Sequence, residues 1–132
     1  MNTTDYRFGT LLGLDHIGIG VSDMEASLRF YAELGFGDVV FDYTGPLGGL
    51  ASLTGHDETA ARVVYLRSTN PTVLGRSGIK LVQIESRPQP PLPDGFAYGE
   101  PGICEVCIHV KGYEDFHRSL MESGHKALMD PN

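Results

Sequence analysis

The sequence predicts an α+β fold in which a complete β-α-β-β-β module is followed by an incomplete second one. Three observations support this prediction. Residues 14–21, "LDHIGIGV", alternate with the period of a strand, the following residues change to helical spacing, and the same change recurs 89 positions later. The 132 residues suffice for one domain with a single core and are few for two independent domains.

The first predicted strand sends Ile17, Ile19 and Val21 to one face and His16 with two glycines to the other. A helix is expected directly after it. Its apolar positions share one face and are Met24, Leu28, Tyr31 and Leu34. Ser22 and Glu25 have the spacing of a capping box, and Gly35 is expected to end the helix.

Three further strands are expected in residues 37–45, 60–68 and 77–87. A glycine-rich loop joins the first two of them. On the last strand, Val82 and Ile84 are expected on one face, and Leu81, Gln83 and Glu85 on the other. Module one therefore spans residues 11–87, and a proline-rich connector spans residues 88–101, which can form neither a helix nor a central strand.

The second half, residues 102–132, begins as the first half did. With an offset of 89, "LDHIGIGVSDMEASLRFYAELG" and "ICEVCIHVKGYEDFHRSLMESG" run together without a gap. The repeat predicts a strand in "GICEVCIHV", residues 102–110, and a helix over 113–123 with Tyr113, Phe116 and Leu120 in the core. One more strand, around 126–129, is expected in the remaining residues.

Two cysteines, Cys104 and Cys107, are separated by an odd number of positions, so on a strand they point to opposite faces. A redox or zinc pair needs a turn or a helix start that brings the two sulfurs together. We therefore assign Cys104 to the core and no joint chemistry to the pair.

The charge of the chain is acidic, with 10 Lys plus Arg against 17 Asp plus Glu and a formal net charge of −7. This balance argues against nucleic acid and anionic membrane surfaces as partners. The sequence has no run as long as a membrane span and no secretory leader pattern. We therefore expect a cytoplasmic protein.

The opening motif "LDHIGIGVSDMEASLRFYAELGF", placed in a repeated β-α-β-β-β module, resembles the vicinal oxygen chelate superfamily over about residues 11–129. That group includes glyoxalases, methylmalonyl-CoA epimerase, extradiol dioxygenases and bleomycin-binding proteins. The resemblance implies paired modules whose mixed sheets curl around a cleft that holds a divalent metal such as Zn, Mn, Mg, Ni or Fe. We expect a homodimer, because the exposed strand edges of an incomplete second sheet invite self-association.

The resemblance implies metal ligands at His16 on the first strand and at Gln83 or Glu85 on the fourth. We favour Gln83 as the ligand and Glu85 as an acid or base. The third ligand position falls on Glu105, where relatives carry His, and carboxylate oxygen is an acceptable ligand for these metals. His109 is about 13 Å further along the strand, too far to join the same ion. Cys107 and His109 are expected to line the cleft and contact the substrate.

Only eight residues follow Gly124, so two strands of the second module, including the one with the last ligand, do not fit. A longer reading frame or a partner chain would supply them, and truncation is the explanation that we favour.

Two functions remain open. The first is a metal-dependent lyase, isomerase or dioxygenase in which the metal acts as a Lewis acid and Glu85 moves a proton. The second is a metal-free protein that sequesters a small aromatic or drug-like molecule, with stacking surface from Tyr43, Tyr65, Phe96 and Tyr98.

Overall fold

The computed structural model describes residues 5–6, 9–10, 14–47, 60–70, 77–90, 99, 105–108 and 110–127. The chain divides into two compact units, residues 1–90 and residues 91–132. The division falls within the proline-rich stretch. Each unit is considered separately below.

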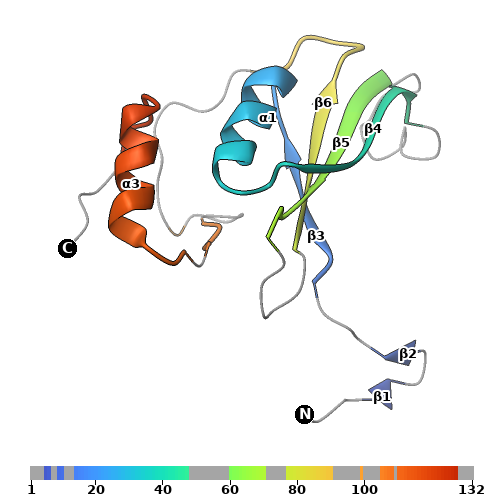
Figure 1. Cartoon of the computed structure of the whole chain (residues 1–132). Coiled ribbons are helices and arrows are strands. Elements are labelled where there is room, and N and C mark those ends of the chain that lie inside the picture. Colours follow the sequence, from blue (N-terminus) through green and yellow to red (C-terminus); the bar gives the residue numbers. More distant parts are fainter. Residues whose placement is uncertain are drawn as a thin grey trace. The chain divides into compact units, whose positions relative to one another are not determined.

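The first unit is a β-α-β-β-β module, as the sequence predicts. Its elements are β3 (His16–Gly20), α1 (Met24–Glu33), β4 (Asp38–Pro46), β5 (Ala60–Arg67) and β6 (Gly78–Ile84). The four strands form one mixed sheet in the order β3-β6-β5-β4, in which only the β3–β6 pair is parallel (Figure 1). Two short strands, β1 (Asp5–Tyr6) and β2 (Gly9–Thr10), pair antiparallel before the module.

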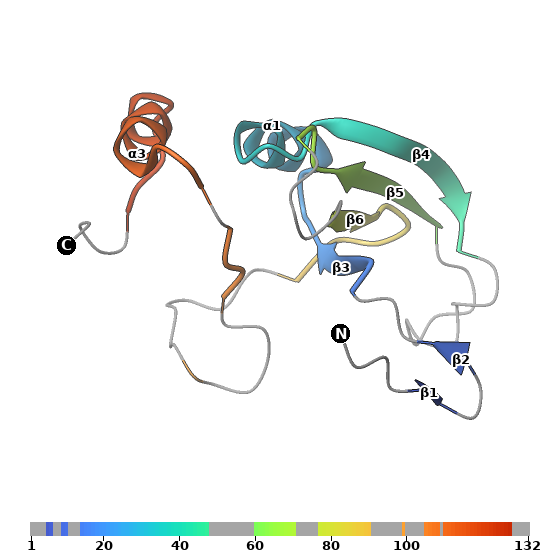
Figure 2. The same cartoon turned by 60° about the horizontal axis from the view of Figure 1, so that its bottom comes forward.

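One face of this sheet, the helix face, holds the apolar core of the module. Aligned across the strands on this face are Leu66, Ile79 and Ile17 in one row and Val64, Leu81 and Ile19 in the next. Leu66, Val64 and Leu81 are each at most 1% exposed. Figure 2 shows the strands in the same order, with α1 beside them. Burying each of these aliphatic side chains stabilises the folded state by about 1.5–3 kcal/mol relative to leaving it exposed.

Two polar side chains at the end of the helix face fasten the start of α1. The Gln83 side-chain oxygen accepts a hydrogen bond of 2.6 Å from the backbone N–H of Met24, the first residue of the helix. Its register partner Arg62 bonds both Glu25 on α1 and Asp42 on β4. These carboxylates raise the pKa of Arg62 above its usual range. These hydrogen bonds therefore attach the start of α1 to the sheet at β5 and β6.

The ends of α1 correct one prediction and confirm another. The expected Ser22–Glu25 capping box is wrong, because Asp23 is the N-cap and its carboxylate accepts from the N–H of Ala26. The expected stop at Gly35 is confirmed. Gly35 has a φ of 92°, and the N–H groups of Gly35 and Phe36 bond back to Ala32 and Tyr31, which is the Schellman pattern.

The second unit repeats the helix of the first. Helix α3 spans Tyr113–Glu122, and both of its bounds lie 89 positions after those of α1. Gly124 has a φ of 89°, and the N–H groups of Gly124 and His125 close the same Schellman pattern. The repeat seen in the sequence is therefore present in the structure as a helix with its stop signal.

The strands of a second module are not seen in the part of the chain that the structure describes. Residues 105–108 and 110 are not in a strand, so the strand expected over 102–110 is wrong for these positions, and residues 125–127 are not in one either. A strand needs a hydrogen-bonded neighbour, and the sheets of the described residues do not include these segments. The resemblance had implied sheets that curl around a cleft. The sheet of the first module is not curled, so this expectation is wrong for it.

Helix α3 also departs from one expectation. None of its residues is fully buried; Tyr113 is 52% exposed, and Phe116 and Leu120 are half-buried. The assignment of Tyr113 to a core is therefore wrong. Among the described residues, no helix is long and apolar enough to cross a membrane.

Candidate functional site

The sheet face opposite the helix face carries a group of aromatic and charged side chains that we call the tyrosine face. Strand alternation and the pairing register assign to it His16, Gly18, Gly20, Phe41, Tyr43, Tyr65, Arg67, Gly78, Lys80 and Val82. His16 lies on this face because it alternates with Ile17 and Ile19, which face the core. The sequence pattern therefore predicted the side to which His16 points.

Tyr65 is the centre of the tyrosine face and is only 7% exposed. Its ring lies over Gly78, where any Cβ atom would overlap it. The ring of His16 meets it edge-on at 5.1 Å, that of Phe41 lies tilted at 5.8 Å, and the Arg67 guanidinium stands 5.4 Å from its centroid. Such aromatic and cation–π contacts each contribute about 0.5–1.5 kcal/mol.

Asp15, which immediately precedes β3, connects these groups. Its Oδ2 accepts hydrogen bonds from His16 Nδ1 at 2.7 Å and from the Tyr65 hydroxyl at 2.8 Å. Its Oδ1 lies 3.7 Å from the Arg67 guanidinium. The hydrogen bonds from His16 and then from Tyr65 lower the pKa of Asp15 below its usual value. The carboxylate is therefore ionised at neutral pH and holds three side chains.

The bond to Asp15 defines which nitrogen of His16 is available. A carboxylate only accepts, so Nδ1 carries the proton, and the neutral ring presents Nε2 as an acceptor. The His16 side chain is 34% exposed. His16 thus has the arrangement of a histidine that could bind a cation or a ligand hydroxyl through Nε2.

Gln83 is on the other side of the sheet from His16. Its register places it with the helix face, and its oxygen is bonded to Met24 at the start of α1. His16 pairs with Gly78, five positions before Gln83, which is about 16 Å along the strands. Ligands of one metal must lie within about 2.0–2.5 Å of it, so one ion cannot be held by both residues.

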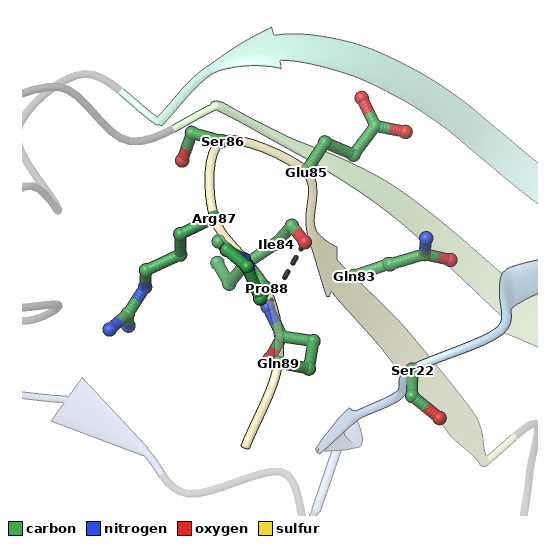
Figure 3. Close-up of a pocket in the computed structure, with 8 residues that line it drawn as sticks. All are labelled: Ser22, Gln83, Ile84, Glu85, Ser86, Arg87, Pro88 and Gln89. Carbon is green, nitrogen blue, oxygen red and sulfur yellow. Dashed lines mark hydrogen bonds between the residues drawn. The ribbon is translucent and has the colours of Figure 1, made fainter. Parts of the chain in front are cut away.

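Glu85 lies in an open pocket of about 580 Å³ at the end of β6. The pocket is lined by Ser22, Gln83, Ile84, Glu85, Ser86, Arg87, Pro88 and Gln89. Figure 3 shows Gln83 and Glu85 extending from one side of the chain and Arg87 from the other. Two hydrogen bonds hold the segment that follows β6. The Gln89 side-chain amide donates to the Ile84 carbonyl at 3.0 Å, and the N–H of Glu85 donates to the Ala60 carbonyl. The Glu85 side chain is exposed.

The other predicted site residues belong to the second unit. Glu105 and Cys107 are exposed, and Cys107 is a free thiol. Cys104 and His109 lie outside the described residues. Their relation to His16 therefore stays a prediction.

A metal site of three or more His, Cys, Asp or Glu side chains is not present among the residues that the structure describes. His16 suits a cation through Nε2, whereas Gln83 does not fit the same ion. The described part of the chain therefore does not bring His16 and Gln83 together, and Glu105 as a metal ligand stays a prediction.

Two groups of the tyrosine face were missed by sequence reasoning. Asp15 immediately precedes β3 and Arg67 is the last residue of β5, and no local sequence pattern marks either as a site residue. Tyr65 and Tyr43 were proposed as stacking residues, and both lie on the face of His16.

Comparison with known proteins adds a family. The sequence profile of the Glyoxalase/Bleomycin resistance protein/Dioxygenase superfamily matches residues 13–97. No curated protein matches the chain. The crystal structure of a glyoxalase family protein from Bacillus cereus superposes with a TM-score of 0.74 at 18% identity, covering 91% of this chain and 77% of that one. This second likeness concerns the fold alone. Because the profile spans more than half of its length, the chain belongs to the glyoxalase/bleomycin resistance protein/dioxygenase superfamily.

Proposed function

We propose that the protein binds a small organic molecule with an aromatic part on its tyrosine face and that this binding needs no metal. The observation that carries the proposal is the packing of His16, Phe41 and Arg67 around the nearly buried Tyr65. This arrangement resembles the floor of a ligand site, in which apolar and aromatic groups give area and a few polar groups give orientation.

The surroundings of Tyr65 favour a planar ligand. Phe41 and Tyr43 are 45% and 46% exposed, which is unusual for large apolar rings that project from a sheet. Gly18 and Gly20 on β3 are exposed and leave this part of the face without side chains. A flat molecule could therefore lie across the sheet against aromatic groups, with Asp15 and His16 as polar neighbours.

Calorimetric titration with 2-naphthamide tests this function. Phe41→Ala removes an exposed ring from the tyrosine face and is expected to weaken binding at least fivefold. Val39→Ala is the matched control, because Val39 is 53% exposed on the same strand but belongs to the helix face by register. Unchanged affinity in the presence of a chelator is also expected. Equal effects of the two substitutions, or no binding, would contradict the proposal.

A metal-dependent lyase, isomerase or dioxygenase is the second candidate. One observation favours it: the hydrogen bond from His16 Nδ1 to Asp15 leaves Nε2 of this partly exposed ring as the nitrogen for a ligand. The remaining ligands would have to come from elsewhere than Gln83, and Glu105 stays a candidate. Metal analysis of the purified protein, followed by the loss of bound metal in His16→Ala, would support this function over the first.

A homodimer remains part of the proposal. Strand β4 is at one edge of the sheet and exposes Val39 and Val40, which are 53% and 47% accessible. Exposed apolar edge strands favour association. Sedimentation equilibrium should give twice the chain mass of 14.3 kDa, and a monomer at all concentrations would refute the dimer.

A further inference from the structure

Lys80 lies in the middle of the tyrosine face. It pairs across the sheet with Tyr65 on β5 and with Gly18 on β3. Phe41 pairs with Tyr65 in turn, so Phe41, Tyr65, Lys80 and Gly18 form one row across the four strands. Side chains paired in this way stand side by side on one face, so the Lys80 stem starts next to the ring of Tyr65.

Lys80 has no acidic partner in the described part of the chain. No hydrogen bond or ion pair joins its ammonium to another described residue, although the side chain is half-buried. The acidic groups on this face belong to the neighbouring row: Asp15 lies at Arg67, and Asp38 is the register partner of Arg67. Partly buried lysines usually have an acidic partner, and this chain has 17 acidic residues, so a half-buried lysine without an acidic partner is unusual.

Among the described residues, the side of Lys80 that faces β3 is lined by glycines. A Cβ atom built on Gly18 would lie 3.8 Å from Cε of Lys80, so the end of the lysine chain passes next to a position that has no side chain. A Cβ on Gly20, the next glycine of β3 on this face, would meet nothing within 4 Å. Both glycines are exposed. An anionic group could therefore approach the ammonium from the side of β3.

We propose that Lys80 binds the carboxylate of a small aromatic acid whose rings lie against the exposed ring of Phe41. This inference rests on the proposed function and adds the chemical class of the ligand. Phe41 and Lys80 are two strands apart, about 10 Å, which suits a two-ring acid. Arg67 is already balanced by Asp15, so one unpaired ammonium remains, and it matches a monoanion better than a phosphate.

Titration with the matched probes 2-naphthoate and 2-naphthamide tests the proposal. The wild-type protein should bind the acid about five- to tenfold more tightly than the amide, as expected for one partly solvated charge pair. Lys80→Met should remove this preference, so that the variant binds the acid and the amide with equal affinity. Lys80→Arg should retain most of the preference. Lys111→Met removes the same charge from an exposed position of the second unit and should change neither affinity.

The outcomes separate this inference from the proposed function. Equal binding of both probes, unaffected by Lys80→Met, would overturn the role of Lys80 and leave the binding function intact. Loss of both probes in equal measure would also overturn it, because Lys80 would then act on the site through packing. Absence of binding by either probe in the wild type would overturn both proposals. Lys80→Gln, which keeps a long polar side chain, repeats the test if the methionine variant does not fold.

Discussion

The hydroxyl of Tyr65 donates a hydrogen bond of 2.8 Å to Oδ2 of Asp15, a residue fifty positions earlier in the chain. The same oxygen accepts from Nδ1 of His16 at 2.7 Å. Because β6 lies between β3 and β5, this contact passes across a strand, and Gly78 provides the space for it. The face that carries His16 is therefore organised by the carboxylate of Asp15 and the hydroxyl of Tyr65.

Removing the Tyr65 hydroxyl should destabilise the ionised form of the Asp15 carboxyl relative to its protonated form. In Tyr65→Phe we expect the pKa of Asp15 to rise towards its ordinary value of 3.8, because one of the hydrogen bonds that lower it is lost. A loss of about 1 kcal/mol in the free energy of unfolding should accompany it. Carboxyl-carbon NMR titration measures the pKa. Tyr43→Phe is the control, since that hydroxyl donates to the Pro46 carbonyl and should leave Asp15 unchanged.

Filling the space at Gly78 should displace Tyr65. A methyl group in Gly78→Ala would overlap the ring, and we expect a loss of about 1–3 kcal/mol in the free energy of unfolding. Gly20→Ala is the matched control, because a Cβ there meets nothing within 4 Å. Urea denaturation measures both. Equal stabilities of the two variants would mean that the ring does not lie over Gly78.

Replacing Gln83 distinguishes a cap from a metal ligand. Gln83→Ala should lower the free energy of unfolding by about 1 kcal/mol, since the N–H of Met24 loses its acceptor. The affinity for Zn²⁺ or Mn²⁺, measured by calorimetry, should not change. Glu85→Ala, in the same pocket, should affect stability little because its side chain is exposed. A large drop in metal affinity with unchanged stability would restore Gln83 as a ligand.

The free energy of unfolding should depend on pH in the acidic range because of two carboxylates, Asp15 and Asp42. Hydrogen bonds from His16 and Tyr65 lower the pKa of Asp15, and Arg62 lowers that of Asp42. A lowered pKa in the folded state gives stabilisation that is complete above the ordinary value of 3.8 and is lost as the pH falls through the lower folded value. Unfolding free energies should therefore decline below about pH 4. Asp15→Asn should flatten this decline, and an unchanged slope would contradict the role of Asp15.

Local sequence signals were enough for the elements of the first module. Strand patterns in the sequence predicted the strands that became β3, β4, β5 and β6, and Gly35 and Gly124 marked the ends of two helices with equivalent bounds. These features depend on neighbours in the chain, such as the left-handed φ that glycine adopts without strain.

The grouping of site residues depended on information that is not local. The faces of His16 and of Gln83 were each predicted relative to their own strand, but which faces coincide depends on the register between β3 and β6. A shift of one residue exchanges the faces. Asp15 precedes the first strand residue, so alternation does not govern its side chain, which turns towards His16 and Tyr65.

The strand pattern failed at residues 105–108 and 110 for a different reason. Alternation makes a segment suitable for a sheet, but a strand forms only where a neighbour accepts its hydrogen bonds. Helix α3 satisfies its hydrogen bonds internally and ends in its own Schellman pattern, and it was predicted correctly.

The most direct test of the account is an amide NMR map of the protein titrated with 2-naphthamide. If the tyrosine face binds the aromatic group, saturable shifts should concentrate at Gly18, Gly20, Phe41 and Tyr65. The pocket residues Ser22, Glu85 and Gln89 should stay unchanged. Shifts confined to that pocket, or none at saturating probe, would contradict the assignment of ligand binding to the face around Tyr65.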